Sequence, residues 1–217
     1  MSNECKDRDL LAIEPSLFAG GGFQSQQLAA GTDGGLAGTT FTSAAADFGA
    51  AGVVAGMVLC VYTTAPAEAR SCEVLSVDSD TSMTVSALRA NADGAAIAPQ
   101  PGSDLKYYVQ TFQPQIVSAE AALAEKLRQV SEAEGIAPSD FADSSQFGQA
   151  VALGALAAVF VARAANASDT DPHWIKAEFY RRRHVAAVAA IRLASDVNGD
   201  GVAERTRTLG NVTLRRA

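Results

Sequence analysis

The chain has 217 residues, of which 48% are hydrophobic, 19% charged and 6% aromatic. This composition excludes wholesale disorder, and the length suffices for one large domain or two small ones with buried cores. The net charge of −7 at neutral pH excludes a protein that coats nucleic acid with its whole surface.

The first 38 residues are predicted to form a short helix followed by Gly-rich loops. Residues 7–18 carry the apolar side chains of a helical opening, and residues 20–22 and 31–38 are flexible loops by composition. Neither loop is followed by the Lys-Ser/Thr pair of a phosphate-binding P-loop. The N-terminal stretch lacks the apolar region of a secretory signal, so we expect synthesis in a cytoplasm.

Residues 39–112 contain short β-type segments separated by turns. Polar residues 78–82 form a turn between two alternating segments, and further strands are predicted over 39–42, 53–62 and 105–112. This spacing predicts a small antiparallel barrel or sandwich. Cys60 and Cys72 fall within the strands and are predicted to be reduced core residues.

From Gln113 onward the apolar period changes from 2 to about 3.6. Helices are predicted over 113–134, about 143–165 and 172–195, and the second is apolar nearly all round. Its longest apolar run, residues 150–162, is too short and Ala-rich to cross a bilayer. The third helix is predicted to turn Trp174, Ala177, Val185, Val188 and Ile191 inward.

The predicted fold class is therefore α+β. It comprises an antiparallel helical bundle, with about three long helices plus a short N-terminal one, and an inserted small antiparallel β-barrel or sandwich domain. The predicted divisions are 1–38 (N-terminal helix and Gly-rich loop), 39–112 (β-domain), 113–196 (bundle) and 197–217 (C-terminal turn and basic tail).

Catalytic motifs are missing from the sequence. No nucleophile elbow or zinc-protease motif occurs, and His173 and His184 are the only histidines. His184 follows three arginines on the third predicted helix, where a surface position explains it better than a catalytic role. We therefore expect a protein that is not an enzyme.

A partial calcium-loop motif follows the third helix. Asp196, Asn198 and Asp200 occupy alternate positions before Gly201, and Glu204 takes the ninth position. The twelfth position, which a complete loop fills with a bidentate carboxylate, holds Arg207 instead. Two interpretations stay open: a weak Ca²⁺ site, or a turn that ends the helix.

Basic residues gather in the last quarter of the chain, where residues 163–217 carry ten Lys/Arg against six Asp/Glu. These arginines are the candidate ring or partner contacts: Arg181, Arg182, Arg183, Arg205, Arg207, Arg215 and Arg216. They could bind phosphates or an acidic patch on a neighbouring subunit, although a cluster of arginines on a helix most often faces solvent. Residues 208–217 have the apolar spacing to add as a strand to another chain.

Four stretches of the chain resemble head-to-tail connector (adaptor) proteins of tailed bacteriophages. They are the opening DRDLLAIEPSLF, the strand segments AAGVVAGMVLCVY and CEVLSVDSDTSMTVSALR, and the closing HVAAVAAIRLASDVNGDGVAERTRTLGNVTLRRA. The resemblance implies a helical bundle with a small β-domain and no catalytic residues. It also implies a homo-oligomeric ring of about twelve copies, located in the virion neck.

The partners that this resemblance implies are the portal protein, tail or neck proteins, and genomic DNA passing through the ring, with no membrane. Three alternatives stay open. The first is another neck or tail component such as a stopper or terminator. The second is a calcium-dependent binding module built on residues 196–204, and the third is an enzyme of unrecognised type. The acidic body and the basic last quarter suit pairing between neighbouring subunits.

Overall fold

The computed structural model describes residues 5–19, 24–134, 145–195 and 205–209. The chain divides into two compact units, Lys6–Phe112 on the one hand and Met1–Cys5 with Gln113–Ala217 on the other. The first unit is called the barrel unit and the second the helical unit. The barrel unit carries eleven Asp/Glu against five Lys/Arg, a net charge of −6.

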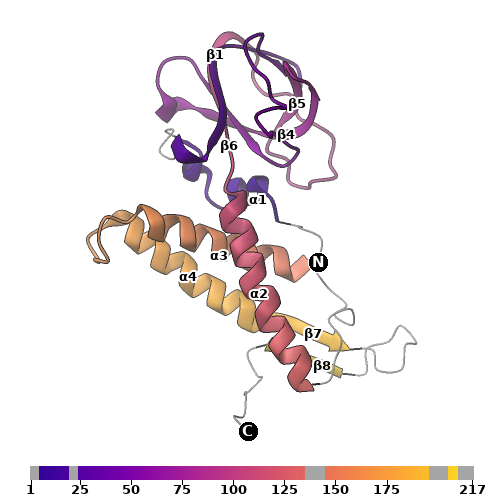
Figure 1. The fold of residues 1–217 in the computed structure, drawn as a ribbon, viewed down its shortest axis with the longest axis vertical. Helices are drawn as coiled ribbons and strands as arrows, with labels where there is room; N and C mark the ends of the chain where they lie inside the picture. Colours follow the sequence, from indigo (N-terminus) through magenta and orange to yellow (C-terminus); the bar gives the residue numbers. More distant parts are fainter. Residues whose placement is uncertain (1–4, 20–23, 135–144, 196–204, 210–217) are drawn as a thin grey trace. The chain divides into compact units, whose positions relative to one another are not determined.

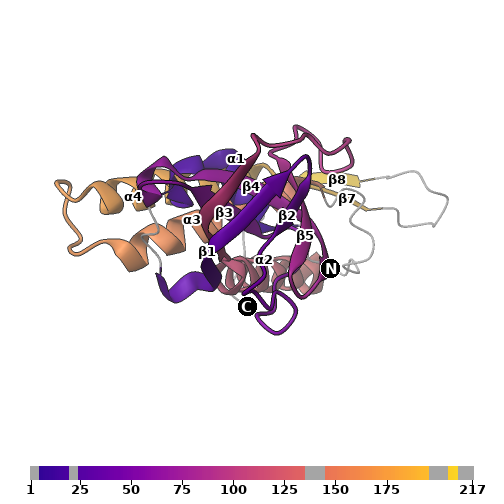
Figure 2. The same ribbon diagram turned by 90° about the horizontal axis from the view of Figure 1, so that it is seen from above.

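The barrel unit opens with a short helix, α1 (Asp7–Ile13), and closes six strands into one antiparallel barrel (Figures 1 and 2). The strand order around the barrel is β1-β2-β5-β4-β3-β6. The strands are β1 (Gln27–Ala37), β2 (Thr40–Thr42), β3 (Val58–Tyr62), β4 (Arg70–Ser79), β5 (Ser82–Ala87) and β6 (Gly102–Gln110). Short 3-10 turns lie at Pro15–Leu17, Gln24–Gln26 and Pro66–Glu68.

The first strand corrects the prediction of a flexible loop over residues 31–38. These residues belong to β1, which pairs with β2 on one side and with β6 on the other. A Cβ atom at Gly31 would lie 2.6 Å from the Tyr107 ring, and one at Gly34 would lie 2.9 Å from the Phe41 ring. The two glycines therefore make room for aromatic rings against the strand, a packing role that composition alone hides.

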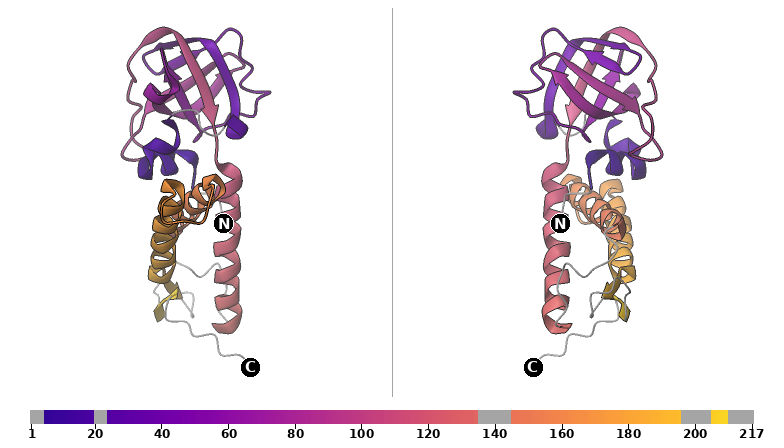
Figure 3. Two further views of the ribbon diagram at one scale, coloured as in Figure 1. Left: turned by 90° about the vertical axis from the view of Figure 1, so that its left-hand side faces the viewer. Right: turned by 90° about the vertical axis from the view of Figure 1, so that its right-hand side faces the viewer.

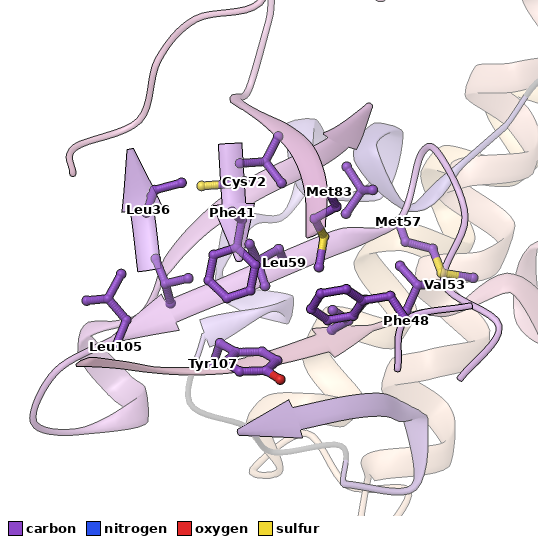
Figure 4. Close-up of a cluster of buried hydrophobic side chains, with 14 residues drawn as sticks. Leu36, Phe41, Phe48, Val53, Met57, Leu59, Cys72, Met83, Leu105 and Tyr107 are labelled. Carbon is purple, nitrogen blue, oxygen red and sulfur yellow. The ribbon is translucent and has the colours of Figure 1, made fainter. Parts of the chain in front are cut away.

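A cluster of buried hydrophobic side chains fills the interior of the barrel, and three of them are aromatic (Figure 4). The Phe41 ring lies edge-on to Tyr107 with 5.0 Å between centroids, and Phe48 lies 6.1 Å from each of them. Edge-to-face pairs of this kind add about 1 kcal/mol each beyond the burial of their area. Phe48 belongs to the loop between β2 and β3, so this loop is anchored in the core.

A buried ion-pair triad joins α1 to the strands. The Glu73 carboxylate on β4 has no exposed surface and accepts hydrogen bonds from the side chains of Arg8 (2.7 Å) and Arg89 (2.6 Å). Burial works against its charge, but the hydrogen bonds from the two guanidinium groups outweigh burial and hold the pKa of Glu73 below its usual value. Arg8 also donates to the backbone oxygen of Arg89, which closes the triad.

The helical unit contains α2 (Gln113–Glu134), α3 (Ser145–Arg163) and α4 (Pro172–Ala190). The predicted antiparallel bundle of three long helices is wrong. Instead, α3 and α4 form a hairpin, and α2 crosses it at an angle (Figures 1 and 3). The crossing lies at Gly154, where a Cβ atom would come within 3.3 Å of Ala119 on α2 and 3.0 Å of His184 on α4.

The side chains of α2 and α3 explain why α2 crosses the hairpin instead of packing along it in a bundle. Gly154 lets helices approach closely at a single point, whereas a bundle needs contact along its whole length. In α2, Leu123 and Leu127 are buried but their neighbours Ala121 and Ala122 are exposed. One narrow apolar seam suits a crossing contact rather than two parallel neighbours.

The third helix is shorter than predicted. It ends at Ala190, and Arg192–Ser195 form strand β7, which pairs antiparallel with β8 (Arg205–Thr208). The Leu209 N–H donates to the Ile191 carbonyl at 2.9 Å, extending this pairing toward the end of α4. Part of the basic tail thus pairs within its own chain.

The predicted buried centre of the bundle, α3, has one exposed side. Leu153 and Leu156 are buried, whereas Val161 is half exposed. By length and composition alone, Gln146–Arg163 suffices to cross a membrane, and among the described residues no other helix does. The apolar segment is thus longer than the run identified from the sequence. Since 56% of it is buried inside the chain, it also matches the core helix of a globular unit.

We expect Glu73→Gln to destabilise the barrel unit by about 3–5 kcal/mol, because the neutral amide leaves the partly buried guanidinium of Arg89 without an ion-pair partner and leaves that of Arg8 with Asp9 alone. Urea unfolding followed by amide hydrogen exchange in β3 and β4 measures the loss. Glu68→Gln, on an exposed 3-10 turn, is the matched control. A loss below about 1 kcal/mol would show that the triad is not structural.

Candidate assembly surface

Asp171 fixes where α4 begins. One carboxylate oxygen accepts the backbone N–H groups of His173 (2.8 Å) and Trp174 (3.2 Å), and the other accepts that of Ala165 at 2.9 Å. Partial burial works against the charge, but these hydrogen bonds keep the pKa of Asp171 below its usual value. Pro172 follows at the first helical position, where its missing N–H costs nothing. The cap therefore sets both the α3–α4 turn and the start of α4.

The inner face of α4 packs against α3. The Phe160 ring stacks on Tyr180 with 5.7 Å between centroids and on His173 with 6.2 Å. His184 shares a hydrogen bond of 2.8 Å between Nδ1 and the carbonyl oxygen of Ala150. Both histidines thus hold the helix hairpin together.

The outer face of α4 also carries apolar side chains, and these are exposed. Ile175 is 50% exposed, Phe179 53% and Val185 59%. At 100° per residue, Ile175, Phe179 and Arg182 fall within about 60° of one another, opposite the buried side chains of Ala177 and Tyr180. The prediction that Val185 turns inward is wrong, because the inner face centres on residues 173, 177, 180, 184 and 188.

The three predicted contact arginines of α4 are exposed beside these side chains. Arg181 forms a two-pronged ion pair with Glu178, with both distances 2.8 Å. The Arg183 guanidinium lies over the Phe179 ring, 5.4 Å from its centroid. Arg182 has no hydrogen bond or ion pair with any described residue, and it lies between the apolar side chains of the face. We call Ile175, Phe179, Val185 and Arg181–Arg183 the outer face of α4.

The remaining predicted site residues are not brought to this face by the described structure. Arg205 and Arg207 lie on β8, and Arg215 and Arg216 are outside the described residues. The predicted Ca²⁺ ligands are outside them as well: Asp196, Asn198, Asp200 and Glu204. Within the described ranges no three His, Cys, Asp or Glu side chains are placed to share a metal ion.

Cys60 and Cys72 are buried and form no disulfide, as predicted. The Cys60 thiol donates to the carbonyl oxygen of Phe18 at 3.3 Å. Burial raises the pKa of Cys60 to about 11 and that of Cys72 to about 12. Both thiols therefore stay protonated at neutral pH and are poor nucleophiles.

Asp7 is the carboxyl group whose environment is least expected from the sequence. It is 1% exposed at the start of α1, accepts the Thr111 hydroxyl at 2.7 Å and accepts the Phe112 N–H at 2.6 Å. Burial raises its pKa to about 6, although both hydrogen bonds act in the opposite direction. Asp7 thus ties α1 to the end of the barrel sequence.

Comparison of the chain with protein family models, curated proteins and solved structures finds no match. The outer face of α4 is the feature that sequence reasoning missed, apart from its arginines. The sequence did indicate a second apolar face, because Ile175 and Phe179 are spaced i, i+4 on the side of the helix opposite to the predicted core positions.

We expect the raised pKa of Asp7 to make the barrel unit less stable as pH rises from about 4 to about 7. Over this range the folded state binds the proton more tightly than the unfolded state does, so unfolding free energy falls by about 3 kcal/mol from this group. Asp7→Asn removes that dependence. Urea unfolding at several pH values compares the two chains, with Asp93→Asn at an exposed carboxyl as the control. If the unfolding free energies of wild type and Asp7→Asn changed with pH in parallel, the claim that burial raises the pKa of Asp7 would be contradicted.

Proposed function

We propose that the chain is a structural subunit of the neck of a tailed bacteriophage. In this proposal it is a head-to-tail adaptor that forms a homo-oligomeric ring between the portal and the tail or neck proteins. It acts by assembling and not by catalysing a reaction. Two observations support the proposal: the resemblance of its sequence segments to connector proteins, and the outer face of α4.

The outer face of α4 carries the argument. A helix on the surface of a monomeric protein normally has one apolar stripe toward the core and a polar opposite side. Here Tyr180 and Val188 are buried on one side, while Ile175 and Phe179 are half exposed on the other. Clustered exposed apolar side chains mark interaction surfaces, so this helix suits a subunit that is covered by a neighbour.

The distribution of charge is consistent with a ring that surrounds DNA without holding it. The barrel unit has a net charge of −6 and the whole chain −7. Tight nucleic-acid binding requires many Lys/Arg–phosphate contacts, whereas like charges on subunit and DNA disfavour binding and permit sliding. A DNA-coating role is therefore less compatible with these charges than a channel role.

Immunogold labelling of particles from a lysate of the source culture tests the proposal. An antibody against the chain is expected to place gold at the head–tail junction, and purified protein is expected to form rings with a central hole in negative-stain electron micrographs. Gold along the tail or at its tip would contradict the adaptor role in favour of another virion protein. Particles without gold, when the epitope is accessible on denatured virions, would contradict both the adaptor role and any other role as a virion protein.

A further inference from the structure

We infer that the outer face of α4 docks on the barrel unit of a second copy of this chain. The docking site is the loop 43–56, together with the carboxylates of Asp33 and Asp80, and we call it the acidic loop surface. This inference rests on the proposed function and deepens it, because it identifies the two surfaces that pair between neighbouring copies.

The acidic loop surface is held in a defined shape. Asp33 accepts the Ser43 hydroxyl at 2.7 Å and the Ala45 N–H at 3.0 Å. Asp47 accepts the Ala50 N–H at 2.8 Å, and the buried Phe48 donates its N–H to the backbone oxygen of Asp80 at 2.8 Å. A surface that is ordered before binding loses less conformational entropy on association.

Carboxylates and apolar side chains alternate on this surface. A Cβ atom at Gly49 would lie 3.0 Å from one Asp80 oxygen and 3.7 Å from one Asp47 oxygen, so these two acids flank a single residue. The hydrogen bond from Ser43, followed by those from the backbone, lowers the pKa of Asp33 and keeps it ionised. Val54 is 56% exposed on the same loop, and Ala44, Ala45, Ala50 and Ala55 are exposed as well.

No cation among the described residues forms an ion pair with these three acids. The outer face of α4 offers the complementary set: Arg182 acts on Glu178 through its charge but has no ion pair with a described residue, and Ile175, Phe179 and Val185 are exposed around it. Pairing the two surfaces places opposite charges together and buries apolar side chains from both. Each surface thus supplies what the other lacks.

Two other occupants of the outer face fit less well. A second α4, paired about a two-fold axis near Arg182, would bring the Arg181–Arg183 segments of both copies together, and like charges in contact are unfavourable. Nucleic acid phosphates would satisfy the arginines but leave Phe179 and Val185 against a polar backbone. The acidic loop surface satisfies both the charges and the apolar side chains.

The pairing joins two different surfaces, so a pair of copies still has one free outer face and one free acidic loop surface. Such a heterologous contact propagates from copy to copy, and it gives a ring when the rotation closes and a filament when it does not. An isologous contact would stop at a dimer. The two modes therefore predict different behaviour of variants.

The test uses one variant on each surface and their mixture. Phe179→Asp blocks the outer face, and Asp80→Lys combined with Asp47→Asn blocks the acidic loop surface while keeping the Asp47 oxygen that accepts the Ala50 N–H. We expect each variant alone to lose self-association by at least about 30-fold in sedimentation velocity and native mass spectrometry. The mixture is expected to form a 1:1 heterodimer and nothing larger, because only one competent pair of surfaces remains.

Matched controls are Val117→Asp, at an exposed apolar position on α2, and Asp93→Lys, at an exposed acid outside the acidic loop surface. Both are expected to assemble as the wild type does, and circular dichroism checks that all variants are folded. A wild-type chain that stays monomeric at about 1 mM, a Phe179→Asp chain that still assembles, or a loop variant that dimerises alone would each overturn the inference.

The inference would also be overturned if the mixture formed no heterodimer, or if duplex DNA bound the wild type through Arg182. The proposed function is judged separately, because labelling at the head–tail junction does not depend on which surfaces pair. A junction label together with an assembling Phe179→Asp chain would leave the adaptor role standing and reject this interface.

Discussion

Helix α4 has apolar side chains on two opposite faces, and α3 covers only one of them. Phe160 stacks on Tyr180 and His173, and Gly154 lets His184 come close to α3, so the inner face is fully used. Ile175, Phe179 and Val185 then have no partner surface within the described hairpin. Their exposure is unfavourable in water, and burial against another copy removes that cost.

The barrel unit contributes rigidity and charge. Its closed strand order leaves no long free edge of the kind that pairs indiscriminately with other chains, and the buried Glu73 triad ties α1 to β4. The aromatic core anchors Phe48, and through it the loop that carries Asp47. The proposed pairing uses the acidic loop surface of one unit and the outer face of α4 on the other, and two different contact sites on each copy are what a closed ring of identical subunits requires.

The sequence revealed some of this organisation and concealed the rest. Alternation over residues 72–88 predicted the pairing of β4 with β5, and the change of period at Gln113 predicted where α2 starts. The strand β1 was missed because Gly31 and Gly34 serve neighbouring rings that no local pattern shows. The bundle was wrongly predicted because the crossing at Gly154 depends on contacts between helices that are distant in sequence. The arginines of the outer face were identified, but Ile175 and Phe179 were not, since helical periodicity alone does not say which of two apolar faces is covered.

Side-chain footprinting with hydroxyl radicals tests the central claim most directly, because it reports the exposure of individual residues in the native, unmodified chain. Oxidation of Phe179 and Val185 is compared with that of Val117 in dilute protein and in the assembled particle. The account predicts that Phe179 and Val185 react in the dilute chain and become protected on assembly, together with Val54, while Val117 stays reactive. Phe179 and Val185 that react equally in both states would show that the outer face of α4 is not the surface that joins the copies.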